Sequence, residues 1–361
     1  MPTTTNLLIK EILATAAAKN ASDIHLTVGN SPFLRINGLL TVMTESEIIK
    51  PEVLEEIVDF FLNKDQKVKL LADKEITLVY YNEEASLRYR LNVFFQKGYP
   101  MISLRLIPAV IPDFSNLGLP KVIADFCENR RGLIIISGPF NSGRTTVLAS
   151  LIQLINLKRA EHIITLEKPI EYLFVNEKSI IEQREVGKDV DSFEKGLTTI
   201  LDEDVNIVAV SEVTSSEILE SVLELAESGR LVFLIMNSDS VVSTLEKFIA
   251  GFKGEKKIWA LNVLSDLLIG ILILRFLPKI TSGMVFAYEI LTMTSAVMAS
   301  IKEGKLYQLS SILQTSRAEG MINLDKSLLE LVKKDQITKE TALREALEKE
   351  SFKNSLRNLS R

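Results

Sequence analysis

Continuous apolar runs alternate with stretches of helical periodicity through the middle of the chain. Runs rich in β-branched residues are typical of strands buried on both faces, and apolar residues three and four positions apart are typical of amphipathic helices. The runs that we interpret as strands are 132–137, 163–166, 207–210 and 231–236. A helix carrying Ile218, Leu219, Val222, Leu223 and Ala226 lies between the last two strands and stops at Gly229. This alternation predicts an α/β domain around a largely parallel sheet.

The first 108 residues have a different pattern. A short helix at Leu7–Ala18 is followed by alternating segments, which predict strands at 23–27, 33–36 and 87–94. Together they indicate a small α+β sheet domain. Residues 109–119 carry turn formers with little periodicity and are predicted as a linker, after which Pro120 opens a helix. The predicted domains are therefore 1–108 and 120–361.

The C-terminal part of the chain has two apolar stripes at helical spacing. The first stripe contains Leu324, Leu328, Leu331 and Val332, and the second contains Ala342, Leu343, Ala346 and Leu347. The tail from 351 to 361 carries three basic residues and no acidic one. We therefore expect two helices and then a frayed, solvated end.

The segment Ala260–Leu277 is densely apolar and must be considered as a membrane span. Asp266 and Arg275 interrupt it, so the apolar run falls well short of the roughly 20 residues that a spanning helix needs. We interpret it as a buried helix followed by a strand, with a break at Gly270. The alternative is a surface that contacts a membrane or a partner.

Composition describes an ordinary protein of more than one domain, with 361 residues, 25% charged residues and a net charge of -5. The acidic balance argues against sequence-independent nucleic-acid binding, which needs a basic surface. The single cysteine, Cys127, excludes an intrachain disulfide, and with His25 and His162 it cannot form a zinc site. Nothing resembles a secretory signal at the N-terminus, so a cytoplasmic location is the default expectation.

Residues 138–146 read Gly-Pro-Phe-Asn-Ser-Gly-Arg-Thr-Thr, which is the pattern of a phosphate-binding loop except that Arg144 replaces the lysine. Gly138 and Gly143 allow backbone amides to approach phosphate oxygens, and the Thr145 hydroxyl can ligate magnesium. A predicted strand precedes the loop and a predicted helix follows it. The alternative is a glycine turn that binds no phosphate.

Six blocks along nearly the whole chain carry a family resemblance. They are Ala21–Leu26, Leu87–Asn92, Thr165–Glu171, Gln183–Val186, Ile207–Glu212 and Ala226–Phe233. In their order and spacing they resemble the PilT-type ATPases that retract type IV pili in twitching motility, within the secretion ATPases.

The resemblance implies a PAS-like domain at 1–108, a RecA-like nucleotide-binding domain at 120–361 and a hexameric ring. It also implies ATP or ADP and Mg²⁺ as ligands, and ATP hydrolysis coupled to the removal of pilin at the base of a pilus. The implied partners are further PilT-type subunits and the inner-membrane platform protein of the pilus. The implied location is cytoplasmic, at the periphery of that machinery.

The resemblance also assigns roles to residues. Glu212 would be the general base that positions the attacking water, and Glu167 would help Thr145 to hold magnesium. Arg88, Arg90 and Arg105 would reach the nucleotide of a neighbouring subunit, where a guanidinium can stabilise charge on the transferring phosphoryl group; alternatively they are solvated edge-strand arginines. The predicted nucleotide-binding residues are Gly138, Ser142, Gly143, Arg144, Thr145 and Thr146.

The chain departs from the family pattern at several positions that we expect to gather around this site. Arginine is a poor substitute for the compact lysine, and Lys168, in place of an aspartate, would repel the metal or pair with Glu167 or Glu171. Arg230 and Asn237 replace two histidines, although Arg230 with Arg144 would make an alternative phosphate clamp. The remaining departures are Ser211, Thr214, Met298 and Ala299.

These departures favour a divergent PilT-type subunit that binds nucleotide, hydrolyses ATP weakly or not at all, and acts as a regulator or hetero-hexameric partner of an active motor. An active hexameric retraction ATPase with reassigned residues is the alternative. A related type II secretion or pilus assembly ATPase is a third hypothesis, against which the sequence shows no cysteine-rich insertion.

Overall fold

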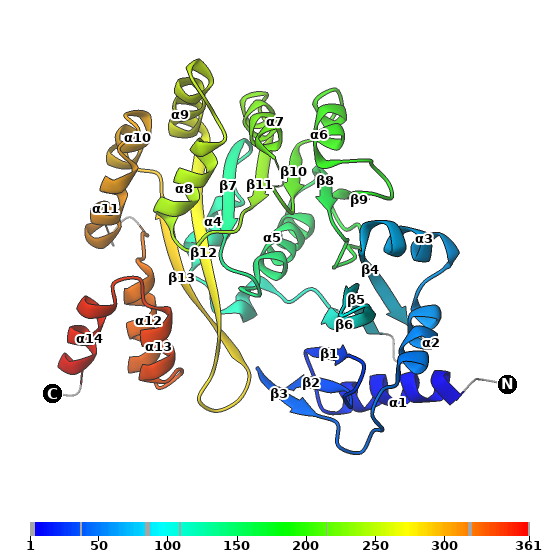
Figure 1. Ribbon diagram of the computed structural model, residues 1–361. Coiled ribbons are helices and arrows are strands. Elements are labelled where there is room, and N and C mark those ends of the chain that lie inside the picture. The colour runs from blue at the N-terminus through cyan, green and yellow to red at the C-terminus, as the bar shows by residue number, and fades with distance from the viewer. Residues whose placement is uncertain are drawn as a thin grey trace. The chain divides into compact units, whose positions relative to one another are not determined.

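The computed structural model describes residues 4–36, 38–83, 87–107, 110–213, 215–316 and 320–359. The chain divides into two compact units, Met1–Val110 and Ile111–Arg361 (Figure 1). The predicted linker at 109–119 falls at this division, and a short 3₁₀ helix, η1 (Phe114–Leu117), lies within it.

The N-terminal unit is an antiparallel sheet with strand order β3-β2-β1-β6-β5-β4. Tyr89, Leu91 and Val93 alternate along β5 and are buried in the hydrophobic core of the unit. The residues between them therefore point to the opposite face of the sheet. The elements are α1 (Thr4–Ala18), β1 (Asp23–Leu26), β2 (Phe33–Ile36), β3 (Leu39–Val42), α2 (Pro51–Phe61), α3 (Lys64–Asp73), β4 (Glu75–Asn82), β5 (Leu87–Gln96) and β6 (Tyr99–Ile107).

The second unit is built on a seven-stranded sheet with strand order β13-β12-β7-β11-β10-β8-β9. Every neighbouring pair is parallel except β12 and β13. The predicted strands at 132, 163, 207 and 231 are all present. The strands are β7 (Gly132–Ser137), β8 (His162–Glu167), β9 (Ile180–Glu185), β10 (Ile207–Val210), β11 (Leu231–Ile235), β12 (Leu268–Pro278) and β13 (Met284–Thr292).

Helices cover both faces of this sheet (Figure 1). Ile134 and Ile136 of β7 pack with α4 and α5, whereas Leu133 and Ile135 pack into the core that contains α6 to α9. Both faces of the central strands are thus apolar, which explains their continuous hydrophobic runs. The helices are α4 (Lys121–Phe126), α5 (Arg144–Lys158), α6 (Phe193–Leu201), α7 (Ser216–Glu227), α8 (Val241–Ala250) and α9 (Glu255–Leu267).

The apolar segment 260–277 is core structure. It comprises the end of α9 and most of β12, and most of its apolar residues are buried. The helix ends at Leu267 rather than at Gly270. Gly270 lies inside β12, where an added Cβ would lie 2.4 Å from the Phe126 ring, so close packing requires this glycine. Within the described ranges, no helix combines the length and apolarity that a membrane span needs.

The C-terminal region is helical, and its last helix corrects one expectation. The tail after residue 350 is not solvated at every position, because Phe352 and Leu356 of α14 are buried in a core with α12 and α13. Their spacing of four residues places both on one face of α14. The helices are α10 (Ser295–Lys302), α11 (Leu309–Thr315), α12 (Leu324–Lys333), α13 (Lys339–Glu345) and α14 (Lys349–Asn358), with the 3₁₀ helix η2 (Leu306–Gln308) before α11.

Candidate functional site

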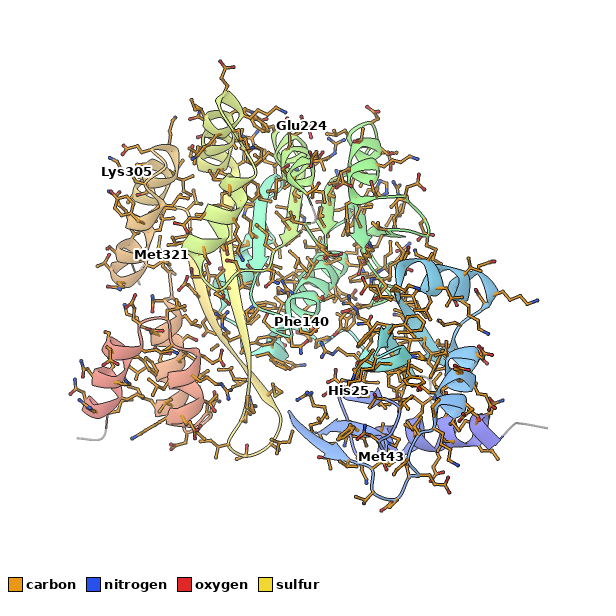
Figure 2. All side chains as sticks on the ribbon, in the orientation of Figure 1. His25, Met43, Phe140, Glu224, Lys305 and Met321 are labelled. Carbon is orange, nitrogen blue, oxygen red and sulfur yellow. The ribbon has the colours of Figure 1, made fainter. Side chains whose placement is uncertain are left out.

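The glycine-rich loop joins the carboxyl end of β7 to the first turn of α5, and Figure 2 labels Phe140 within it. Gly138 and Gly143 have positive φ angles of 153° and 85°. A Cβ added at Gly138 would lie 2.6 Å from the Leu274 carbonyl oxygen, and one at Gly143 would lie 2.6 Å from the Phe286 ring. Both the backbone conformation and the surrounding space therefore demand glycine.

The residues at the start of α5 fit a bound phosphate group. The Ser142 hydroxyl is buried and has no hydrogen-bond partner among the described residues, although buried polar groups are almost always paired. It precedes a helix N-terminus, where free amides and the helix dipole attract anions. Thr145 is half-buried in the first turn of α5. The Thr146 hydroxyl lies 2.9 Å from the Tyr172 hydroxyl, so that side chain already has a protein partner.

Arg144 points to the end of β11. Its Nη1 donates to the carbonyl oxygen of Met236 at 2.5 Å. Burial lowers the pKa of this guanidinium, while the negative charges of Glu212 and Glu171 oppose that shift. Both carboxylates therefore lie within electrostatic range of Arg144, which stays positively charged at neutral pH.

Glu212 lies at the same edge of the sheet as the loop. It follows β10 by one intervening residue, Ser211, whose amide donates to the Leu166 carbonyl oxygen at 3.0 Å. The carboxyl ends of β7, β8, β10 and β11 share this edge because the four strands are parallel. The Glu212 side chain is exposed. Thr214, also named as a departure, lies outside the described residues.

Glu167 ends β8 and is almost completely buried, with 7% of its surface exposed. Its Oε1 accepts hydrogen bonds from Thr165 Oγ1 at 2.7 Å and from Gln183 Nε2 at 3.0 Å. Burial raises the pKa of this carboxyl group, and the two hydrogen bonds partly oppose the shift. Lys168, the next residue, is exposed, so it is not buried in an ion pair with Glu167.

A magnesium ion at this site would depend on the nucleotide. In the ranges that the structure describes, no group of three or more His, Cys, Asp or Glu residues is arranged to hold a metal. The protein ligands that the sequence proposes, Thr145 and Glu167, supply oxygen atoms, which Mg²⁺ prefers. Mg²⁺ is commonly held by few protein oxygens together with phosphates and water, so this donor set fits a nucleotide-bound ion.

Replacing Glu167 with glutamine should stabilise the protein at pH 8 and have no such effect at pH 4. The folded-state pKa of Glu167 is raised above its ordinary value of 4.5. The folded chain therefore holds this proton more tightly than the unfolded chain, and stability falls as the pH rises from about 4.5 through the folded-state pKa. Glutamine keeps the Oε1 acceptor and removes the charge. Urea unfolding at both pH values measures the difference, with exposed Glu224→Gln on α7 as the control; an equal gain at both pH values would contradict the prediction.

Arg230 corrects the expectation that all the departures gather around one site. It precedes β11, whereas Asn237 follows that strand, so the two residues lie about 20 Å apart at opposite edges of the sheet. Arg230 donates to the Ser228 hydroxyl at 2.6 Å and to the Glu203 carbonyl oxygen at 2.7 Å. A phosphate clamp made by Arg144 and Arg230 is therefore excluded within one subunit. Met298 and Ala299 lie on α10, which packs against α9.

The three arginines of the N-terminal unit share one face of its sheet. Arg90 of β5 lies opposite Arg105 of β6, and Arg88 is two residues from Arg90. Arg105 is already engaged, because its Nη2 lies 2.7 Å from Oδ1 of buried Asp23. Their proposed contact with a neighbouring subunit stays a prediction.

Three residues of the site region were missed as site residues at the sequence level. Tyr172 holds Thr146, Phe286 packs against Gly143, and buried Arg275 donates to the Asp239 carbonyl oxygen. Tyr172 stands just after the acidic block 165–171, which was the available signal. Phe286 and Arg275 come from the β12–β13 hairpin, more than 100 positions from the loop along the chain, and no local pattern marks them.

Residues 3–250 match the family model described as type II/IV secretion system protein. The type IV pilus retraction ATPase PilT of Pseudomonas aeruginosa is 31% identical over 95% of this chain and 99% of its own. The type IV pilus ATPase PilU of the same organism is 29% identical over 93% of this chain and 88% of its own. A crystal structure of the pilus retraction motor PilT with bound ADP superposes with a TM-score of 0.83 at 34% identity, covering 96% of this chain and 99% of that one.

Proposed function

Because this chain belongs to the type II/IV secretion system protein family, among the PilT- and PilU-like pilus retraction ATPases, we propose that it binds ATP and ADP at the 138–146 loop and hydrolyses ATP weakly or not at all. In this role it regulates or accompanies an active retraction motor. The nucleotide part is supported by the buried, unpartnered Ser142 hydroxyl in the loop and by the ADP in the similar PilT structure.

The placement of Arg144 is the main observation that supports weak hydrolysis. The loop cation has to follow the charge that develops on the β- and γ-phosphates. Arg144 instead donates to the Met236 carbonyl oxygen and lies near Glu212 and Glu171. A phosphate must compete with these partners, and the wide guanidinium fork cannot replace a compact ammonium in a closed loop.

The other residues retain parts of a hydrolytic site. The loop amides and the Ser142 hydroxyl bind phosphate oxygens, and Thr145 with Glu167 would hold Mg²⁺. The ion, when bound, would neutralise phosphate charge. Exposed Glu212 would orient the attacking water and accept its proton.

The assembly that we propose is a hexamer with PilT-type subunits, either of this chain alone or with a paralogue. Arg88, Arg90 and Arg105 would then face the nucleotide of the neighbouring subunit, and the ring would act at the inner-membrane pilus platform from the cytoplasmic side. A basic surface for nucleic acid is not expected at a net charge of -5.

An active retraction motor is the second candidate. The observation that favours it is the intact edge of the sheet, where the glycine loop, Thr145 and an exposed Glu212 lie at the ends of parallel strands. In that case Arg144, after leaving Met236 for the bound nucleotide, would bridge the β- and γ-phosphates well enough to support hydrolysis.

The test measures nucleotide binding and ATP turnover on the assembled protein. We expect a fluorescent ADP analogue to bind, and phosphate release to stay at the level of a Glu212→Gln variant. Turnover like that of P. aeruginosa PilT, abolished in Glu212→Gln, would replace this proposal with the active motor. Failure of ADP to bind to properly assembled protein would contradict both candidates.

A further inference from the structure

The connection from β11 to α8, residues 236–240, lies directly beside the glycine-rich loop. Two contacts join it to the loop and its strand: Arg144 Nη1 donates to the Met236 carbonyl oxygen at 2.5 Å, and Ser137 Oγ donates to the Ser238 carbonyl oxygen at 3.5 Å. The connection also carries Asn237, whose side chain is exposed at the nucleotide edge of the sheet. A movement of the Arg144 side chain would therefore directly change a hydrogen bond of this connection.

A buried arginine holds the connection from the other side. Arg275 of β12 is only 5% exposed, although arginine is rarely buried without partners. Its Nη2 donates to the Asp239 carbonyl oxygen at 2.9 Å, and its Nε lies 3.6 Å from Oε2 of Glu345. Glu345 is the last residue of α13, so one guanidinium joins the connection to a C-terminal helix.

A buried carboxylate makes a second link of the same kind. Glu289 of β13 is 2% exposed, and it accepts hydrogen bonds from the Val241 amide at 2.7 Å and the Leu324 amide at 3.4 Å. These are the first residues of α8 and α12, so Glu289 caps both helices. In the β12–β13 register Glu289 lies opposite Ile273 and Arg275 lies opposite Ala287, which places Glu289 and Arg275 on one face of the sheet.

We propose that Arg275 and Glu289 are positioning residues that couple nucleotide binding at the loop to the docking of α12 and α13, through the 236–240 connection. The inference rests on the proposed nucleotide binding. A phosphate in the loop competes with the Met236 carbonyl oxygen for Arg144, because a guanidinium binds an anion more strongly than a neutral carbonyl. The connection, once released by Arg144, changes its contacts with Arg275 and Glu289. Both residues transmit the change to the C-terminal helices, which lie beside β13 (Figure 1).

Hydrogen exchange of the full-length protein with and without ADP tests the coupling. In the wild type, ADP should slow exchange in residues 138–150 and also change it in 237–248 and 324–348. Arg275→Met should keep the response of the loop, lose the response of 339–348, which Arg275 reaches through Glu345, and weaken ADP binding by about fivefold, the lower end of typical coupling between sites. Arg275→Lys keeps a cation that can donate to the Asp239 carbonyl oxygen, so it should restore part of both effects.

Two further variants sharpen the test. Glu345→Gln leaves the bond between Arg275 and Asp239 in place and should lose only the response of 339–348, which gives a second measurement if Arg275→Met does not fold. Asp239 also places its Oδ1 3.3 Å from Arg275 Nη2, and Asp239→Asn keeps both that oxygen and the backbone acceptor, so it should retain the response of 339–348. If ADP protects the loop but exchange in 324–348 never responds, or if the response of 339–348 persists in both Arg275→Met and Glu345→Gln, the coupling is wrong while nucleotide binding stands. If ADP neither binds nor protects the loop, the proposed function fails and this inference with it.

Discussion

Replacing Arg144 with lysine is expected to raise ATP turnover by about tenfold or more without loss of nucleotide binding. One well-placed electrostatic group at a reacting phosphate contributes roughly a hundredfold or more to the rate. Lysine presents a compact ammonium that follows the β- and γ-phosphates, and loss of the guanidinium removes the bond to the Met236 carbonyl oxygen. The gain is smaller than the full factor because Lys168 and Asn237 remain, and active-site effects are not additive. Phosphate release by the assembled protein at saturating ATP measures it.

Two controls give this result its meaning. Arg131→Lys makes the same exchange at an exposed position before β7 and should leave turnover unchanged. Adding Glu212→Gln to Arg144→Lys should abolish the gained turnover. If Arg144→Lys binds nucleotide as before but gains no activity, another departure limits hydrolysis and the central role given to Arg144 is wrong.

Replacing Gly143 with alanine is expected to weaken ADP binding by more than about a hundredfold. Alanine at a φ of 85° costs about 1 kcal/mol in backbone strain. Its Cβ would also lie 2.6 Å from the Phe286 ring, a contact that forces the loop or the ring to move. Binding depends on several loop amides converging on one phosphate, so a displacement of about 1 Å removes most of the affinity. Titration with a fluorescent ADP analogue gives the affinity.

Gly283 offers a matched control for backbone strain. Its φ of 81° is close to that of Gly143, but an added Cβ there meets nothing within 4 Å. Gly283→Ala should therefore lose a similar small amount of stability and bind ADP like the wild type. Comparable affinities for the two variants would show that the closed space around Gly143 is unimportant for the phosphate loop.

Arg230 shows where motif matching misled the prediction of the site. The strand predicted at 231–236 already separates Arg230 from Asn237 by its own length, yet their shared motif suggested a shared location. The structure places only Asn237 at the loop edge. Glu167 illustrates the opposite case, because its place at the end of β8 follows from the strand pattern while its burial by Thr165 and Gln183 does not.

Local sequence patterns did not predict the packing of α14 or the burial of Arg275 and Glu289. Phe352 and Leu356 stand four residues apart in a tail with three basic residues. The prediction of a solvated end relied on those charges and overlooked this short apolar stripe. Arg275 was interpreted only as an interruption of an apolar run. Its partners, Asp239 and Glu345, come from segments 36 positions before it and 70 after it, and folding alone brings them together.

The amino-acid sequence suffices for the family, the four central strands at 132, 163, 207 and 231 of the second unit, and the position of the glycine-rich loop. These features rest on local physics: buried strands need apolar runs, a phosphate loop needs glycine at fixed spacing, and parallel strands bring their carboxyl ends to one edge. The contacts of Arg144 with Met236 and the links made by Arg275 and Glu289 required the folded chain. They join segments far apart in sequence, and the partner that a long charged side chain chooses is set by burial and by which carbonyl or carboxylate lies within reach.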